Sequence, residues 1–433
     1  MEETNMDENE QSREAEVAPA LIAVHPSQDS VAVSVGSDLR VFNLLRCHSE
    51  SLSDDSGGNI HRDSIRAIRY GAEGKLFVSA GDDKLVKIWN TDSWRCTHTI
   101  LSEKRVSAVA ISKDGCFVCF ADKFGAVYAT HLDNVHEKRD IPDKKPVLIL
   151  SHYCSIITSL EFSPDGRFII SADRDFKIRV TLFPKNPLNG AHEIQSFCLG
   201  HTEFVSCLAF VCNQDCPQGF LVSGGGDSTV RLWDYVSGSL LDKCLVGAQA
   251  GVALSNGGEE DFVPAITDIC ATPDGSLVAV AVQSLPGVML LTCDLSMTSL
   301  ALFKVVPIVG SETFIPTSLG TATSADVLWL VMGVSGLNGS SESTEGSLVR
   351  VRVLSGFKKS LEEETSLLED KDVPGEEEML RKLQGDLRVK TEAFLTAAEA
   401  VKAAMRNLFI KKQYSADTRE FRKRGRNDRK GKK

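Results

Sequence analysis

The sequence predicts an all-β fold, a seven-bladed β-propeller, from one repeated polar pattern and a regular succession of short apolar strands. In the pattern, a serine is followed by an aspartate four residues later and a tryptophan ten residues later, with a histidine upstream. Two copies are complete: His61, Ser79, Asp83 and Trp89, and His201, Ser223, Asp227 and Trp233. This spacing is typical of WD-repeat blades, four-stranded sheets arranged around a central axis.

The apolar strands recur at intervals close to the length of one such blade. Five clear units begin at residues 65, 106, 157, 205 and 266, and they are 41 to 61 residues apart. Two degenerate units, at 20–42 and 314–353, bring the number of blades to seven. Seven blades leave only short, protected edges provided that the chain termini share one blade to close the ring, and the sequence leaves the manner of closure open.

A third unit departs from the repeated pattern. His152, Ser171 and Asp175 occupy the histidine, serine and aspartate positions, but Thr181 replaces the tryptophan. We interpret all three sets as structural tetrads, because these side chains can form one satisfied polar network within a blade. They superficially resemble a Ser-His-Asp catalytic triad, but a catalytic site is needed once and a blade staple once per blade. We therefore expect no catalytic residues.

Charge is distributed unevenly along the 433 residues. The net charge is −11, whereas residues 411–433 carry 11 Lys/Arg against 3 Asp/Glu, a local charge of +8. Such a basic tail serves nuclear import or contacts RNA phosphates, and we favour the nucleus as location, with the cytoplasm as a further one. The residues of this cluster are Arg422, Lys423, Arg424, Arg426, Arg429 and Lys430.

The composition divides the chain into five segments. We expect a disordered acidic N-terminus at 1–17, the propeller at 18–356, an acidic linker at 357–375, an amphipathic helical extension at 376–410 and a disordered basic tail at 411–433. The helical stripe repeats every seven residues: Leu380, Leu387, Phe394, Val401 and Leu408. Two alternatives remain open for this helix, docking on its own propeller or contact with a partner.

Several other functional classes are not indicated. The acidic start is unlike a signal peptide and no run of about 18 apolar residues occurs, so we expect an intracellular, soluble chain with reduced cysteines. Cys116 and Cys119 lie in an apparent buried strand, and Cys212 and Cys216 lack a second ligand pair, so we expect no metal site. No phosphate-binding glycine motif or nucleophile elbow is present, and we expect no cofactor on this chain.

Two segments, one within the odd unit at 152–181 and one that follows it, carry a specific resemblance. They are Ala172-Asp-Arg-Asp-Phe-Lys-Ile-Arg-Val180 and Phe197-Cys-Leu-Gly-His-Thr-Glu-Phe-Val205. Together with Lys104-Arg-Val and Ala121-Asp-Lys-Phe-Gly125, they resemble the WD-repeat, non-catalytic subunit of eukaryotic tRNA (guanine-N7-)-methyltransferase. The resemblance extends over residues 65–234 and weakens beyond them.

This resemblance implies a scaffold function. A separate Rossmann-type methyltransferase subunit would form a heterodimer with this chain, hold S-adenosylmethionine and methylate a guanine N7 of tRNA. The propeller would hold that subunit in its active conformation, and tRNA would bind through the complex. The resemblance places the partner-binding residues at Asp173, Arg174, Asp175, Lys177 and Arg179.

Alternative interpretations compete with this one. Arg179 aligns with Lys87 and Arg231, so spacing alone describes it as a solvated strand residue. A substrate receptor of a cullin-type ubiquitin ligase is the main functional rival, although the expected arginine is replaced by Val236 after Trp233. A propeller enzyme with a site in the central channel is the second rival.

Overall fold

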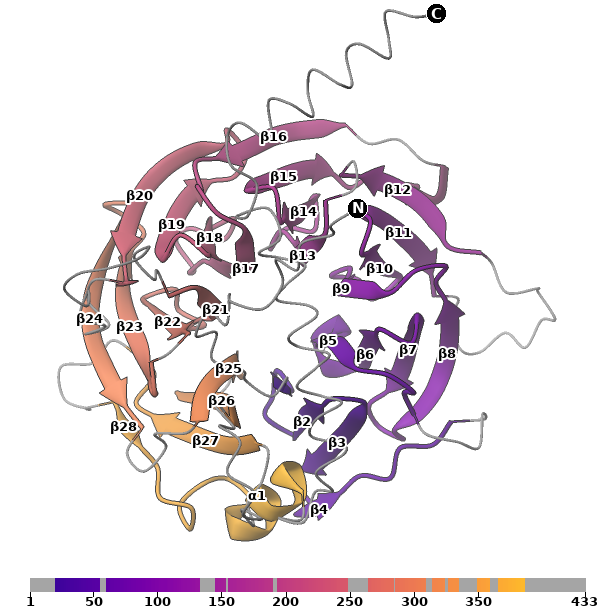
Figure 1. The fold of residues 1–433 in the computed structure, drawn as a ribbon, viewed down its shortest axis with the longest axis vertical. Helices are drawn as coiled ribbons and strands as arrows, with labels where there is room; N and C mark the ends of the chain where they lie inside the picture. Colours follow the sequence, from indigo (N-terminus) through magenta and orange to yellow (C-terminus); the bar gives the residue numbers. More distant parts are fainter. Residues whose placement is uncertain are drawn as a thin grey trace, which may run out of the picture.

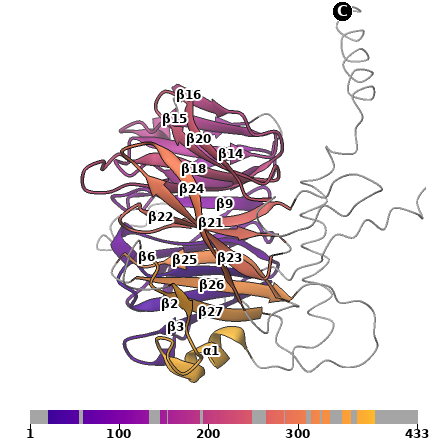
Figure 2. The same cartoon turned by 90° about the vertical axis from the view of Figure 1, so that its left-hand side faces the viewer.

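The computed structural model shows a ring of seven four-stranded antiparallel sheets (Figure 1). It describes residues 20–54, 60–132, 145–152, 155–189, 193–247, 264–283, 285–308, 314–323, 326–334, 349–358 and 365–385. Seen from the side, the blades form a thick disc (Figure 2). The predicted fold, a seven-bladed propeller, is confirmed.

Each blade is built from four consecutive strands, the first nearest the central axis and the fourth at the rim. Blades 1 to 3 contain β1 (Ala20–Val24), β2 (Ser30–Val35), β3 (Asp38–Asn43) and β4 (His48–Ser49); β5 (Ile65–Gly71), β6 (Leu76–Gly81), β7 (Leu85–Asn90) and β8 (Arg95–Leu101); and β9 (Val106–Ile111), β10 (Phe117–Asp122), β11 (Ala126–His131) and β12 (Val147–Ser151). Blades 4 and 5 contain β13 (Ile157–Phe162), β14 (Phe168–Asp173), β15 (Lys177–Leu182) and β16 (Ile194–Leu199), and β17 (Val205–Val211), β18 (Phe220–Gly225), β19 (Thr229–Asp234) and β20 (Ser239–Leu245). Blades 6 and 7 contain β21 (Ile266–Ala271), β22 (Leu277–Val282), β23 (Gly287–Asp294) and β24 (Ser299–Pro307), and β25 (Phe314–Thr321), β26 (Val327–Val334), β27 (Val349–Ser355) and β28 (Ser366–Leu367).

The innermost strands of the five clear units begin at the residues that the sequence predicts. Two three-residue 3₁₀ turns lie within blades: Ala72–Gly74 between β5 and β6 of blade 2, and Pro187–Asn189 between β15 and β16 of blade 4. The second strands of blades 1, 4 and 6 are buried on both faces, as expected where a sheet is covered by a neighbour on each side. Seven clusters of buried hydrophobic side chains result, one at each interface between adjacent blades.

The described residues close the ring without a blade shared between the two ends of the chain. Blade 1 takes all four strands from residues 20–49, and blade 7 takes all four from residues 314–367. The two blades meet instead through side chains: Thr317 Oγ1 donates a 2.8 Å hydrogen bond to the carbonyl oxygen of Ala20. Thr267 of blade 6 donates in the same way to Pro316 of blade 7, at 3.1 Å. The seam between the first and last blades therefore repeats a contact made elsewhere in the ring.

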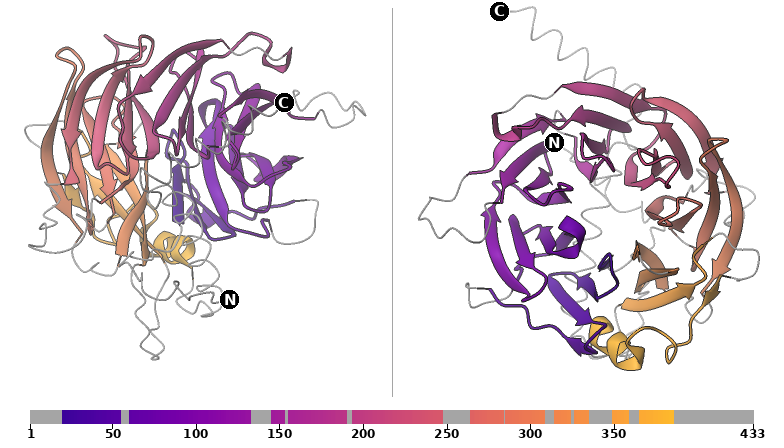
Figure 3. Two further views of the ribbon diagram at one scale, coloured as in Figure 1. Left: turned by 45° about the horizontal axis from the view of Figure 1, so that its top comes forward. Right: turned by 180° about the vertical axis from the view of Figure 1, so that it is seen from behind.

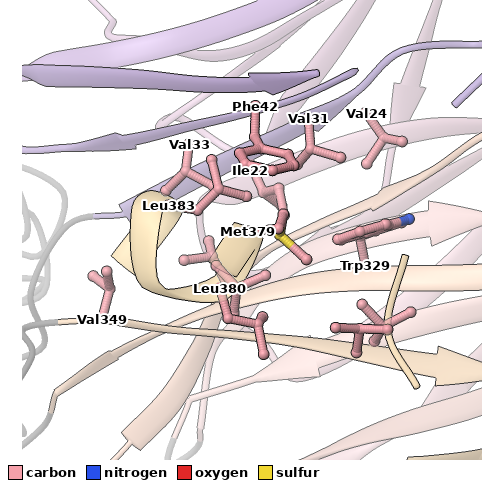
Figure 4. Close-up of a cluster of buried hydrophobic side chains, with 14 of the residues drawn as sticks. Ile22, Val24, Val31, Val33, Phe42, Trp329, Val349, Met379, Leu380 and Leu383 are labelled. Carbon is pink, nitrogen blue, oxygen red and sulfur yellow. The ribbon is translucent and has the colours of Figure 1, made fainter. Parts of the chain in front are cut away.

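A short helix, α1 (Glu376–Gln384), covers this seam at the rim, between β3 and β27 (Figures 2 and 3). Its buried side chains, Met379, Leu380 and Leu383, join Phe42 of blade 1 and the valines of β27 in one hydrophobic cluster (Figure 4). Arg40 of β3 also donates a 3.0 Å hydrogen bond from Nη1 to the carbonyl oxygen of Leu383. Because the cluster contains residues of both blades and of the helix, α1 joins the two ends of the ring.

The helix has the expected end signals. Three glutamates lie in its first turn, where their negative charge interacts favourably with the positive end of the helix dipole. Gly385 follows the last turn with φ of 79°, and its N–H bonds to the carbonyl oxygen of Arg381. The predicted extension thus docks on its own propeller over Glu376–Gln384, while the remainder, 386–410, lies outside the described residues together with the N-terminus at 1–17 and the tail at 411–433.

The segment predicted as an acidic linker, 357–375, does more than connect. Ser366 and Leu367 form β28, which pairs with Ser355 and Leu354 and completes the last blade. The propeller therefore extends to Leu367, beyond the predicted boundary at residue 356, because the outer strand of blade 7 lies within this acidic stretch. None of the described helical residues forms a helix long and apolar enough to cross a membrane.

The contribution of α1 to ring closure can be measured in the full chain. Leu383→Ala removes a fully buried side chain from the seam and should lower the free energy of unfolding by about 2–5 kcal/mol. Lys382→Ala, on the exposed face of the same helix, is the matched control and should stay within about 0.5 kcal/mol of the wild type. Urea unfolding followed by circular dichroism gives both values. Equal stability of the two variants would mean that α1 does not hold the seam.

Candidate partner-binding site on the fourth blade

The tetrads predicted in blades 2 and 5 are assembled as networks in the structure. In blade 2, His61 Nδ1 lies 2.8 Å from the Asp83 carboxylate and His61 Nε2 lies 2.8 Å from Ser79 Oγ, to which the Trp89 indole N–H donates at 3.0 Å. In blade 5 the corresponding distances from His201 to Asp227 and Ser223 and from Trp233 to Ser223 are 3.0, 2.8 and 2.8 Å. Although burial alone raises the pKa of Asp227, hydrogen bonds from His201 and Thr229 outweigh it and lower the pKa.

In blade 4 the tetrad aspartate is Asp173, and the assignment of this role to Asp175 is wrong. His152 Nδ1 lies 2.9 Å from the Asp173 carboxylate, and its Nε2 lies 2.7 Å from Ser171 Oγ. Strand β14 ends at Asp173, whose second carboxylate oxygen accepts the backbone N–H groups of Asp175 and Lys177. In blade 3, the Asp122 carboxylate accepts two backbone N–H groups in the same way. The turns of blades 3 and 4 therefore resemble each other and differ from those of blades 2 and 5.

The correction also changes the predicted partner-binding set. Asp173 is only 2% exposed and is occupied by His152, so it supports the turn from within. Arg174, Asp175 and Arg179 are half-buried, and Lys177 is exposed. The structure therefore brings four of the five predicted residues to the surface of one turn and the strand that follows it.

Arg179 occupies the same place in its blade as Lys87 and Arg231, because each pairs across the sheet with the tetrad serine. Their surroundings nevertheless differ. Lys87 is 2% exposed and ion-paired with Asp54, and Arg231 is 6% exposed with its guanidinium 3.4 Å from the Asp227 carboxylate. Of these three side chains, that of Arg179 is the most exposed to solvent, a difference that the sequence spacing could not reveal.

Contacts with Ser151 and Phe197 orient the Arg179 guanidinium. It donates a 2.8 Å hydrogen bond to the carbonyl oxygen of Ser151 in β12 of blade 3. It also lies 5.7 Å from the centroid of the Phe197 ring, within the range of a cation–π interaction. Phe197, on β16, was not singled out by the sequence as a site residue, although it lies in one of the two family-like segments.

Another of the family-like segments, Ala121–Gly125, lies on the neighbouring turn of blade 3. The ring of Phe124 is exposed, and the ammonium groups of Lys104 and Lys123 lie 5.7 and 5.3 Å from its centroid. The Gly125 carbonyl oxygen of this turn accepts the N–H of His152. The turns of blades 3 and 4 are thus joined through His152, the neighbour of Ser151, whose carbonyl oxygen accepts a hydrogen bond from the Arg179 guanidinium.

The central channel contains charged side chains that connect different blades. A cavity of about 530 Å³ is lined by the innermost strands of all seven blades. Within it Arg69 of blade 2 and Glu161 of blade 4 form a 2.5 Å ion pair, and Asp268 of blade 6 accepts the backbone N–H of Leu319 in blade 7. Burial raises the pKa of both carboxyl groups. These contacts join blades to one another and assign no catalytic role.

The cysteines of the described residues are free thiols. Cys119 is buried on β10, which raises its pKa, and Cys116 is half-buried at the preceding turn. Within the described ranges, no three potential ligands of the His, Cys, Asp or Glu type gather in a way that could hold a metal ion.

Comparison with known proteins finds a family model that matches a part of the chain including blades 4 to 6. The model described as the tRNA methyltransferase TRM82 WD40 domain matches residues 131–313, and the WD domain, G-beta repeat model matches residues 59–90. The predicted resemblance is confirmed.

Curated relatives carry the same description. The chain is 36% identical over 236 residues to the tRNA (guanine-N(7)-)-methyltransferase non-catalytic subunit wdr4 of Danio rerio, covering 54% of this chain and 52% of the relative. It is 31% identical to the subunit of the same name from Dictyostelium discoideum, covering 53% and 49%. The chain thus spans about half the length of the curated relatives it matches.

Among solved structures, the RRP9 WD40 repeats superpose with a TM-score of 0.57 and 18% identity, covering 75% of this chain and 88% of the other. At this identity the likeness concerns the fold alone.

The corrected tetrad can be tested by stability. Asp173→Ala leaves the buried His152 ring and two backbone N–H groups without their acceptor and should lower the free energy of unfolding by about 3 kcal/mol. Asp175→Ala should cost less than about 1 kcal/mol. Thermal or urea unfolding of both variants gives the comparison. The reverse order of the two effects would restore Asp175 to the tetrad.

The charge of Arg179 should be detectable at His152. Burial lowers the pKa of His152 below its ordinary value of 6.5, and the charges of Arg179 and Lys177 lower it further, against the bond to Asp173. The unfolded chain therefore binds this proton more readily, and the stability due to His152 falls as the pH drops below 6.5. Arg179→Leu should raise the pKa of His152, measured by NMR titration of the histidine rings with His152→Gln for assignment. An unchanged or lower pKa would contradict this electrostatic coupling.

Proposed function

We propose that this chain is the non-catalytic propeller subunit of a tRNA (guanine-N7-)-methyltransferase. The observation that carries the proposal is the family match over residues 131–313, which includes the charged turn and strand of blade 4. The two relatives described above are named as subunits of this enzyme, which favours the proposal over a ubiquitin-ligase receptor. No separate observation favours a second function.

The proposed partner is the catalytic subunit, which would bind S-adenosylmethionine and supply the methyl transfer. Arg174, Asp175, Lys177 and Arg179 would contact it, while Asp173 holds their turn in place from inside the blade. The propeller acts by binding the active conformation of the partner preferentially. A few kcal/mol of differential affinity is sufficient to shift a two-state partner from mostly inactive to mostly active.

The basic tail would have an auxiliary role. Its charge of +8 suits nuclear import and contacts with tRNA phosphates, and the first of these uses supports a nuclear location for the complex. The acidic remainder of the chain favours confining any direct RNA contact of this subunit to such a local basic segment.

Reconstitution tests the proposed function. The full chain is produced with and without the catalytic methyltransferase subunit, and N7-methylguanine is measured on unmodified tRNA. We expect activity to require both chains, with none from this chain alone. Full activity of the partner alone, with no complex formed, would refute the scaffold function.

The same assay includes a chain that ends at Ile410. If the tail contacts phosphates, its removal should raise the KM for tRNA and reduce the dependence of binding on salt concentration. An unaltered salt dependence would leave nuclear import as the proposed use of the tail.

A further inference from the structure

The outer strand of blade 4 carries an aromatic side chain at a position that is polar in the other tetrad blades. Phe197 pairs across the sheet with Arg179. The equivalent partners are Thr99, opposite Lys87 in blade 2, and Lys243, opposite Arg231 in blade 5. The substitution of an aromatic ring therefore coincides with the blade that also has the unusual charged turn.

Phe197 belongs to one face of the blade that the neighbouring blades do not fully cover. Strand alternation places Phe197 and Leu199 beside Arg179 and Lys177 respectively, and Phe197 is 38% and Leu199 60% exposed. Cys198, between them, points to the opposite face and is buried against blade 5. The first face is directed toward blade 3, where Arg179 bonds to Ser151.

The two apolar and two cationic side chains form a surface of defined chemistry. Single exposed apolar residues are common on soluble proteins. Here two of them, Phe197 and Leu199, each pair across the sheet with a cation on the same face. Arginine and aromatic residues are enriched among the side chains that contribute most to protein interfaces. The Phe197 ring and the Ser151 carbonyl also orient the guanidinium beforehand, which reduces the entropy lost when a carboxylate binds it.

We propose that Phe197, with Leu199, is the apolar anchor of the surface that binds the catalytic methyltransferase subunit, and that Arg179 and Lys177 are its cationic flank. The matching element of the partner presents an apolar side chain with acidic side chains beside it. This inference rests on the proposed function and adds to it an apolar contact on β16 that the charged turn alone does not supply.

The test measures the affinity of the purified catalytic subunit for variants of the full chain. Phe197→Ser should weaken binding at least tenfold, and Arg179→Leu should do the same. Phe197→Leu, which keeps an apolar side chain but loses the ring, should have an intermediate effect. Phe303→Ser is the matched control, because Phe303 is an exposed phenylalanine (49%) on the outer strand of blade 6 and should alter affinity less than twofold. Circular dichroism and thermal unfolding of each variant establish that the propeller remains folded.

The possible outcomes separate the anchor from the function. Wild-type affinity of a folded Phe197→Ser chain, with weakened Arg179→Leu, would overturn the anchor and keep the charged site. Wild-type affinity of both variants would overturn the whole surface while the heterodimer stands. Failure of the wild-type chain to bind the catalytic subunit would refute the proposed function itself. If the free chain self-associates and Phe197→Ser makes it monomeric, a second copy occupies the surface and the proposal is overturned.

Discussion

The propeller depends on the hydrophobic contact between its first and last blades, because a ring of radially packed sheets is stable only when every blade has two neighbours. Six of the interfaces join blades that follow each other in the chain, and their clusters form from nearby segments. The seventh brings residues of β1–β3 against β26, β27 and α1. Leu383 and Phe42 thus help to hold every other blade in its place.

Polar contacts fix what the apolar clusters leave adjustable. Hydroxyl groups near the start of innermost strands donate to the next blade, as Thr267 and Thr317 do. Within blades, the tetrad ties the incoming loop to the turn between the second and third strands. In blade 4 the Asp173 carboxylate of this network accepts the backbone N–H of Lys177, and Arg179 pairs across the sheet with the tetrad serine, Ser171.

Much of this architecture follows from the sequence, because apolar strands of even length and tetrad spacing are local signals. The innermost strands at 65, 106, 157, 205 and 266 begin where that pattern places them. The assignment of Asp175 failed because a four-residue spacing was carried over from blades whose turns differ, whereas Asp173 already ends its strand. The manner of ring closure stayed open because nothing in a local pattern indicates that α1 packs on β3. Phe197 could have been found by aligning the outer strands, where Thr99 and Lys243 are its counterparts.

The closure by α1 has a consequence for the order in which the protein is made. Blade 1 is complete when residue 49 has been synthesised, yet Met379 and Leu383, which cover its outer side, come more than 300 residues later. At translation rates of about 5–20 residues per second, that delay is on the order of tens of seconds. During this interval the valines of β2 lack their final neighbours in blade 7 and α1. The apolar cluster at the seam is therefore complete only after α1 has been synthesised.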